Sequence, residues 1–297
     1  MVRKTKKSRR PCFAWHRLML LPALSIFLVF VILPILEGAV LAFTDWDGFH
    51  TPGFVGPDNF VRFLKDDQAL TAVKNTVFFG IGGTLLLNVI GLAYALVLDS
   101  GLRLKGVLRT IVYLPAIISP LIIGYIWSII LSAENGTLLN LMTKMGIGSL
   151  FKNVLADPKS ALVVIVLVHA WQYIGGNMII YLAGLQNIPD DLTESVKIDG
   201  AGFARQLFSV KLPLLGPSFQ INIVTNIIGA MSMFDVIMSL TNGGPGHYTE
   251  SLSVFIYRLS TGSRAGYTSA VSLIMSVLVL IPAGSAFYLM QKMNVEK

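Results

Sequence analysis

The sequence predicts an all-α membrane protein with six transmembrane helices. Only 13% of its 297 residues are charged and 54% are hydrophobic, whereas a typical soluble domain has about 25% charged residues. Its mean hydropathy is +0.69, which excludes a disordered chain, a basic nucleic-acid-binding domain and a typical cytosolic enzyme. A helix needs about 20 mainly apolar residues to cross a bilayer. Six stretches meet this requirement, at residues 18–43, 76–98, 108–131, 161–185, 217–240 and 268–290.

The first apolar stretch is predicted to be an uncleaved anchor rather than a signal peptide. Residues 1–17 are strongly basic, as in the charged start of a signal peptide. A cleavable signal, however, has an apolar core of about 7–15 residues and a cleavage site with small residues. The apolar run here is longer and ends in Ala42, Phe43, Thr44, Asp45 and Trp46.

The positions of Lys and Arg predict the orientation of the chain. If residues 1–17 are cytoplasmic, 15 of the 23 basic residues lie on the cytoplasmic side and 8 on the outer side. Cytoplasmic loops carry the excess of Lys and Arg, so both termini are expected in the cytoplasm. The resulting parts are a basic tail at 1–17, the first transmembrane helix with its outer loop at 18–75, a five-helix core at 76–290 and a tail at 291–297.

The cytoplasmic loop at residues 186–216 is unusual. It is about 30 residues long and mixes acidic and basic residues with helix-forming ones after Pro189. We expect two short surface helices in it.

Polar residues inside the fourth and fifth spans form two stripes. Polar groups in hydrocarbon usually face a bundle interior or a water-filled cavity. Each stripe follows helical spacing, so each occupies one helix face. The stripes are candidates for a solute path, although such groups also hydrogen-bond between helices purely for association, and both interpretations stay open. They consist of His169, Gln172, Tyr173, Gly176 and Asn177 in the fourth span, and Asn222, Asn226 and Met233 in the fifth.

Motifs of enzymatic chemistry are missing from the sequence. It contains no GxSxG, no HExxH and no phosphate-binding GxxxxGK[ST], which are signatures of hydrolases, metalloproteases and nucleotidases. Its four histidines are far apart and Cys12 is its one cysteine, so no metal site is predicted. The chain is therefore expected not to be an enzyme. If it transports actively, the energy comes from a partner or from an ion gradient.

Residues 194–213 carry a recognisable spacing. Glu194, Ser195 and Val196 are followed after three residues by Gly200, and after nine more by Val210, one residue, Leu212 and Pro213. This pattern resembles the EAA motif of binding-protein-dependent ABC transporter permeases, with Ser and Val in place of two alanines and Val in place of isoleucine. Further stretches are similar to the MalF-like sugar permeases: WDGF at 46–49, FVGPDNFVRFL at 54–64 and LTNGGPGHYTESLSVFIYR at 240–258.

The resemblance implies a permease subunit of an ATP-driven importer for a sugar or oligosaccharide, in the cell (inner) membrane of a bacterium or archaeon. It implies three kinds of partner: a second related permease subunit, two cytoplasmic ATPase subunits that bind ATP and Mg, and an extracytoplasmic solute-binding protein. No cofactor is expected on this chain. By the same resemblance, a coupling helix contacts the ATPase through Glu194, Ser195, Val196, Ile198, Asp199, Gly200, Ala201, Leu212 and Pro213.

The outer loop after the fifth span is a candidate surface for the binding protein. Its residues Asn242, Gly243, Gly244 and Pro245 are the expected contact, with an ordinary turn as the alternative.

An ion-coupled secondary carrier is the competing function. Such carriers normally need membrane-embedded carboxylates or an inverted repeat. Only Glu37 and Asp235 are candidates here, and either can instead serve helix pairing or capping. The sequence leaves open whether the solute is a monosaccharide, a disaccharide, an oligosaccharide or a glycerophosphodiester.

Overall fold

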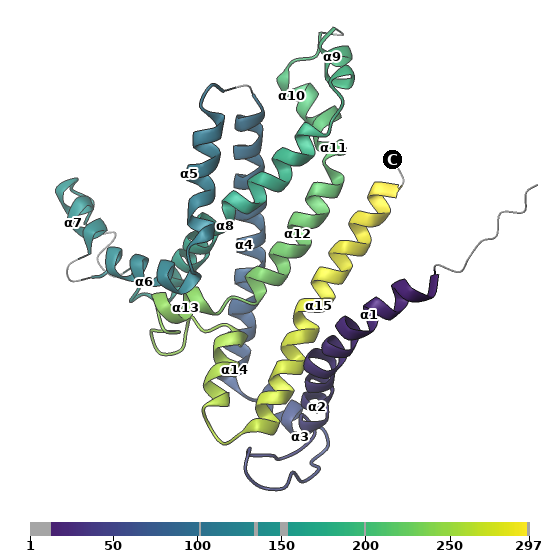
Figure 1. Cartoon of the computed structure of the whole chain (residues 1–297). Coiled ribbons are helices and arrows are strands. Elements are labelled where there is room, and N and C mark those ends of the chain that lie inside the picture. Colours follow the sequence, from purple (N-terminus) through teal and green to yellow (C-terminus); the bar gives the residue numbers. More distant parts are fainter. Residues whose placement is uncertain (1–12, 101, 134–135, 149–153, 199, 296–297) are drawn as a thin grey trace, which may run out of the picture.

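The computed structural model is a bundle of long helices with short helices at both ends (Figure 1). It describes residues 13–100, 102–133, 136–148, 154–198 and 200–295, so most of the basic tail at 1–17 lies outside the described residues. The elements are α1 (Phe13–Phe27), η1 (Leu28–Ile32), α2 (Leu33–Leu41), α3 (Asp58–Leu64), α4 (Asp67–Asp99), α5 (Lys105–Ile117), α6 (Pro120–Ile130), α7 (Thr137–Lys144), α8 (Pro158–Gln186), α9 (Asp190–Ile198), α10 (Phe203–Gln206), η3 (Leu207–Lys211), α11 (Leu212–Leu214), α12 (Gly216–Met231), α13 (Asp235–Leu240), α14 (Leu252–Ser260) and α15 (Ala265–Val295).

Four helices in the described residues are each long and apolar enough to cross a membrane. They cover Leu20–Leu41, Asp67–Asp99, Pro158–Gln186 and Ala265–Met293, and two bent helix pairs bring the number to six if each pair is one span. The four helices and the two bent pairs each overlap one of the six predicted stretches. Two of them differ from the expected straight helices.

The third span bends sharply in its middle. Helices α5 and α6 meet at 97°, although the sequence predicted one helix over 108–131. The cause lies at Pro120, whose ring disfavours helical backbone at the residue before it. Ser119 accordingly has φ −54° and ψ 133°, and α6 begins again at the proline.

The fifth span ends earlier than predicted. Helix α12 stops at Met231, and the short α13 starts at Asp235, whereas the sequence predicted a helix over 217–240. No proline or glycine lies in the intervening residues 232–234, so their sequence alone does not signal the break. At its other end α12 is bent by 69° from the helical stretch at 203–214.

Local sequence explains where several helices begin and where the hydrogen bonding changes from α-helical to π-helical. Asp66 accepts from the backbone N–H groups of Gln68 and Ala69 at the start of α4, and Asp157 accepts from Ser160 at the start of α8, which is the preferred cap for unpaired N–H groups. The two π-helical segments, η1 and η3, are each followed by a proline, Pro34 and Pro213. Proline removes a backbone donor from a helix, which explains the local change of hydrogen bonding.

Helix α8 lies at the centre of the bundle and contacts α4, α5 and α12. Its contacts with neighbouring backbones are made possible by glycine. A Cβ on Gly175 would lie 2.6 Å from the Tyr113 Cα and 2.6 Å from the Val112 carbonyl oxygen, both on α5. A Cβ on Gly91 of α4 would lie 2.8 Å from the Asn177 Cβ. Small residues permit such close approach between membrane helices.

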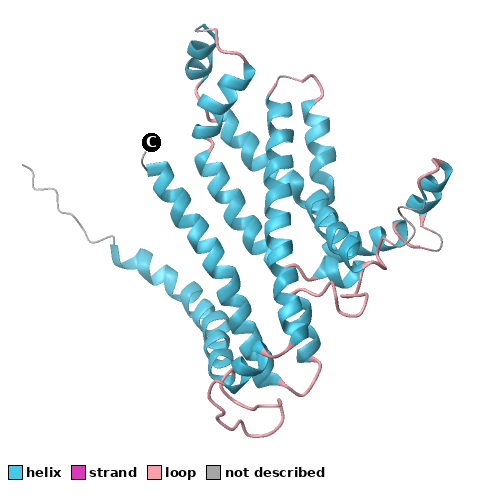
Figure 2. Cartoon of the chain, turned by 180° about the vertical axis from the view of Figure 1, so that it is seen from behind, coloured by secondary structure: helices cyan, strands magenta, loops and turns pink. Residues whose placement is uncertain are grey.

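The two ends of the bundle differ. Helices α9 and α10, the α4–α5 connection and the C-terminal end of α15 lie at one end, while α3 and the α14–α15 turn lie at the other (Figures 1 and 2). Helix α2 packs on α15 at the edge of the bundle, and the window of this first span is 0% buried. In a membrane this surface faces lipid or another subunit.

We expect Gly175→Ala to lower the stability of the chain by about 1–3 kcal/mol, the usual cost of overpacking, because its new methyl group would meet the α5 backbone. The neighbouring Gly176→Ala is a matched control, since a Cβ there meets nothing within 4 Å. Thermal unfolding of the two variants in detergent checks this. Equal unfolding midpoints would contradict the close contact between α8 and α5.

Candidate functional site

The two broken spans meet around one small cavity. It has a volume of about 110 Å³. Its walls come from the start of α6, from α8, from the end of α12 and from the break before α13, so both helix breaks contribute to it. Irregular backbone at membrane depth is tolerated where it is buried in protein or lines a cavity. The lining residues are Pro120, His169, Tyr173, Gly229, Ser232, Met233, Phe234, Asp235 and Val236.

Three of the residues predicted for the solute path lie at this cavity. The rings of His169 and Tyr173 have centroids 4.8 Å apart. Met233 reaches the cavity from the break of the fifth span. Asp235, which the sequence left ambiguous, also lines the cavity and is exposed. Imidazole, phenol and carboxylate groups thus meet here, and all three bond hydroxyl groups well.

Gln172, predicted for the solute path, bonds to the backbone at the bend of the third span. It is fully buried, and its Nε2 donates to the Ile118 carbonyl at 2.9 Å. Ile118 is the residue directly after the end of α5, so the amide satisfies a carbonyl freed by the bend of the third span. Its Oε1 has no partner among the described residues.

The asparagines of the two stripes bind one another. Asn226 Nδ2 donates to Asn177 Oδ1 at 2.6 Å, and Asn177 Nδ2 donates back to Asn226 Oδ1 at 3.3 Å. Asn222 Nδ2 donates to the Asn177 carbonyl at 3.4 Å. The stripes of spans four and five therefore face each other as expected, and for these three residues the contact is one of helix association. Gly176 lies beside them with open space at its Cβ position.

The loop at 186–216 contains the expected surface helices, α9 and then α10 with η3 and α11. Gly200 turns the chain between them with φ 78°, a value that glycine reaches without strain. The Ala201 N–H donates to the Val196 carbonyl at 3.1 Å, closing the end of α9. Asp199 and the side chain of Ile198 lie outside the described residues.

The side chains of this loop offer a surface for another protein. Glu194 and Ser195 are exposed, while Val196, Ala201, Leu212 and Pro213 are half-buried. Phe203 and Phe208 are each 68% exposed, and large apolar side chains left in the open at the end of a bundle mark an interaction site. Lys211 Nζ lies 2.6 Å from Asp99 Oδ2, so an ion pair fixes the loop to the end of α4.

The predicted outer contact surface is partly internal. Asn242 is exposed, and Gly244 and Pro245 are half-buried, but Gly243 is buried. Gly243 has φ 76°, and a Cβ there would lie 2.6 Å from the Glu250 Cγ. It therefore shapes the loop rather than offering a surface.

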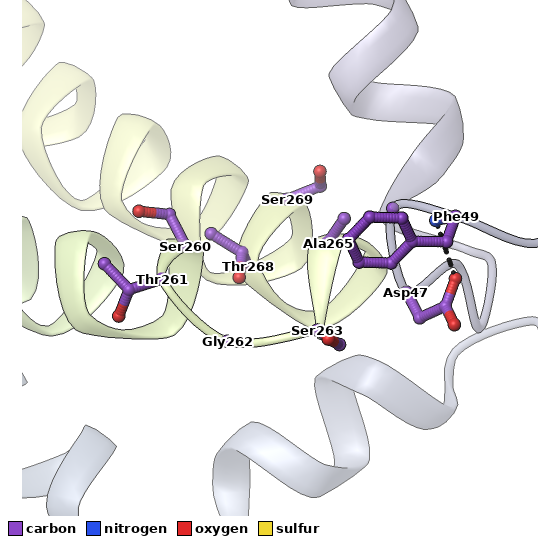
Figure 3. A pocket seen from close by; sticks show the side chains of 10 residues that line it. Asp47, Phe49, Ser260, Thr261, Gly262, Ser263, Ala265, Thr268 and Ser269 are labelled. Carbon is purple, nitrogen blue, oxygen red and sulfur yellow. Dashed lines mark hydrogen bonds between the residues drawn. The ribbon is translucent and has the colours of Figure 1, made fainter.

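A larger concavity at the same end was not found by sequence analysis (Figure 3). It has a volume of about 370 Å³ and lies between the loop of Asp47, Gly48 and Phe49 and the residues around the α14–α15 turn. The N–H groups of His50 and Phe49 donate to Asp47 and hold the pKa of its carboxyl well below its usual range, and the bond to Asp47 raises the pKa of His50. In the sequence, only the WDGF stretch at 46–49 marked this loop, because the partner segment lies more than 200 residues away.

We expect Asn226→Ala to lower stability by about 0.5–2 kcal/mol, the range of hydrogen bonds between membrane helices, because it leaves Asn177 without its interhelical partner. Thr225→Ala is the control, since Thr225 bonds only within its own helix. A double-mutant cycle with Asn177→Ala, followed by thermal unfolding, measures the coupling. Strictly additive effects would mean that the two amides do not interact.

Similarity to known proteins agrees with this geometry. Residues 87–295 match the family described as binding-protein-dependent transport system inner membrane component. The trehalose/maltose transport system permease protein MalF of Thermococcus litoralis is 34% identical over 270 residues, 89% of each chain. The probable starch degradation products transport system permease protein AmyD of Thermoanaerobacterium thermosulfurigenes is 30% identical over 283 residues, 95% of this chain and 96% of that protein.

Among solved structures, the chain is similar to one in a bacterial alginate ABC transporter in complex with alginate pentasaccharide-bound periplasmic protein. The TM-score is 0.83 at 25% identity, over 94% of this chain and 95% of the other. These relatives are transport permeases rather than enzymes. With its apolar spans, the chain is a multi-pass membrane protein, and it belongs to the binding-protein-dependent transport system inner membrane components, as a MalF-like permease of carbohydrate ABC importers.

Proposed function

We propose that this chain translocates a sugar or oligosaccharide that an extracytoplasmic binding protein delivers, and that ATP hydrolysis on partner subunits drives the step. A second, related permease subunit completes the path, and the loop at 186–216 contacts an ATPase subunit. ATP and Mg bind to the ATPase subunits rather than to this chain. The proposal is supported by the family match and by relatives whose names state trehalose/maltose and starch-product transport.

The single observation that carries the proposal is the meeting of two broken spans at one cavity. Small-molecule sites usually measure about 300–1,000 Å³, whereas this cavity measures about 110 Å³. A sugar therefore needs either movement of the broken helices or a contribution from the second permease subunit. Both follow from alternating access, in which rigid bundles rotate around a fixed site.

The coupling step rests on the loop with α9 and α10. Its exposed Phe203 and Phe208 supply apolar anchors of the kind that dominate interfaces, and exposed Glu194 offers a carboxylate to a basic partner group. Because the Lys211–Asp99 ion pair joins the loop to α4, movement of the loop by the ATPase subunit is transmitted to the helix bundle. Under this proposal α9 and both termini face the cytoplasm.

We expect uptake in vesicles to require ATP and the ATPase subunits, and not an ion gradient. Within that assay Gly200→Val should reduce uptake about tenfold, because a left-handed backbone costs a residue with a Cβ about 1–2 kcal/mol or more. Gly202→Val is the matched control: both positions have open space for a Cβ, but only Gly200 has positive φ. ATP hydrolysis by the assembled complex should continue in the Gly200 variant.

Cross-linking gives an independent check on the docking surface. A cysteine at Ala201 should cross-link to the ATPase subunit in the assembled complex. Uptake driven by an ion gradient without ATPase would instead identify a secondary carrier, and a failure of Ala201→Cys to cross-link in any nucleotide state would refute the coupling role.

A second prediction concerns the cavity. We expect Tyr173→Phe to weaken uptake about two- to tenfold, the effect of one net hydrogen bond, because it removes a hydroxyl from the cavity wall. Tyr288→Phe, on the exposed side of α15, is the control. Initial uptake rates at several concentrations of sugar-loaded binding protein measure the effect. Equal rates for both variants would place the solute path elsewhere, chiefly in the second permease subunit.

A further inference from the structure

Residues 249–252 form a loop segment that runs through the interior of the protein. Thr249, Ser251 and Leu252 are fully buried and Glu250 is 2% exposed. Connecting segments normally run over the surface, because a buried loop must find partners for its backbone polar groups. The contacts of this segment therefore show what it is held against.

Its first attachment is to α4. Asn75 Nδ2 donates to the carbonyls of Tyr248 at 2.7 Å and Glu250 at 2.9 Å. Thr76 Oγ1 accepts from the Leu252 N–H at 2.8 Å. Asn75 and Thr76 are themselves buried, so two adjacent side chains of the second span hold the segment at both of its ends.

Its second attachment is to the break in the fifth span. Ser251 Oγ donates to the Met233 carbonyl at 2.7 Å and accepts from the Val254 N–H at 3.3 Å as the cap of α14. Met233 lies between α12 and α13 and lines the cavity. Buried carbonyls without a partner are costly, so the hydroxyl helps to determine the position of the broken backbone.

The other end of the segment reaches the surface. The preceding residues His247 and Tyr248 are exposed, Tyr248 by 58%. Glu250 Oε1 lies 2.6 Å from Arg258 Nε and 2.5 Å from His247 Nδ1, and Arg258 donates to the Asn242 carbonyl at 2.5 Å. These contacts join the exposed residues His247 and Asn242 to the buried Glu250.

We propose that residues 249–252 act as a rigid strut that transmits docking on the exposed loop at 242–248 to the helix break beside the cavity. Asn75, Thr76 and Ser251 are its positioning residues. The inference rests on the proposed function, in which the docking partner is the solute-binding protein. Gln172 holds the other break through Ile118, but its one hydrogen bond is to α5, so it has no part in the strut.

Three variants loosen the strut by different means. Thr76→Val is nearly isosteric and removes the acceptor for the Leu252 N–H, Asn75→Leu removes both bonds to loop carbonyls, and Ser251→Ala frees the Met233 carbonyl. Ser251→Thr keeps a hydroxyl and should restore function. Ser253→Ala, two residues further along the chain, is the matched control, because its hydroxyl has a 3.8 Å contact with the Met275 sulfur and no bond to the break is found for it among the described residues.

The first measurement is the rate of ATP hydrolysis by the complete complex. The rate is measured without the cognate binding protein and then with it, the binding protein being added either together with maltose or as purified. We expect basal hydrolysis within twofold of wild type, and stimulation by the binding protein reduced about two- to tenfold in each strut variant, the size of one hydrogen bond. A residue that merely supports folding would change both rates or the yield of complex. Wild-type stimulation in assembled Thr76→Val and Ser251→Ala complexes would overturn the strut.

The second measurement does not depend on the solute or the binding protein. In a Cys12→Ser background, Asp235→Cys places a thiol just after the break, where a maleimide reports its accessibility. Labelling should be about two- to tenfold faster with Thr76→Val or Ser251→Ala, and unchanged with Ser253→Ala. Unchanged labelling in the strut variants refutes the inference. If the binding protein fails to stimulate ATP hydrolysis in the wild-type complex, that result refutes the proposed function but not the strut, and the labelling measurement then decides about the strut.

Discussion

Helix α8 approaches α5 and α4 at glycine residues, so closely that the backbones nearly touch at Gly175 and Gly91. Lipid tails are as apolar as leucine, so helices in a membrane gain little from hydrophobic burial against each other and depend on close packing and hydrogen bonds. This approach brings Gln172 within reach of the Ile118 carbonyl and Asn177 within reach of Asn226. These hydrogen bonds lie at the bend of the third span and between α8 and α12.

The polar groups of the interior divide into two sets with different tasks. Gln172, Asn177 and Asn226 have partners in other helices, and Ser251 has one in the break of the fifth span. His169, Tyr173 and Asp235 instead face the cavity between the breaks. Each break thus has a carbonyl that accepts a hydrogen bond from a side chain outside the cavity lining, Gln172 at one break and Ser251 at the other.

The two ends of the bundle also contrast. At the end with α9, apolar side chains such as Phe203 and Phe208 stay exposed. At the opposite end, Glu250 and Thr249 are drawn into the interior and bonded there.

Sequence alone located the six apolar stretches, the pair of short helices around Gly200 and the facing polar stripes of the fourth and fifth spans. These follow from local rules: span length, the φ freedom of glycine and helical spacing. The bend before Pro120, which the sequence analysis did not predict, also has a local cause, because proline restricts the backbone of the residue before it. The tertiary structure decided the rest. At the break of residues 232–234 the Met233 carbonyl accepts from Ser251, 18 residues away, and Gln172 donates to the carbonyl of Ile118, 54 residues away. Which polar residue lines a cavity and which closes a break is determined by distances between helices, and helical spacing within one span carries no information about them.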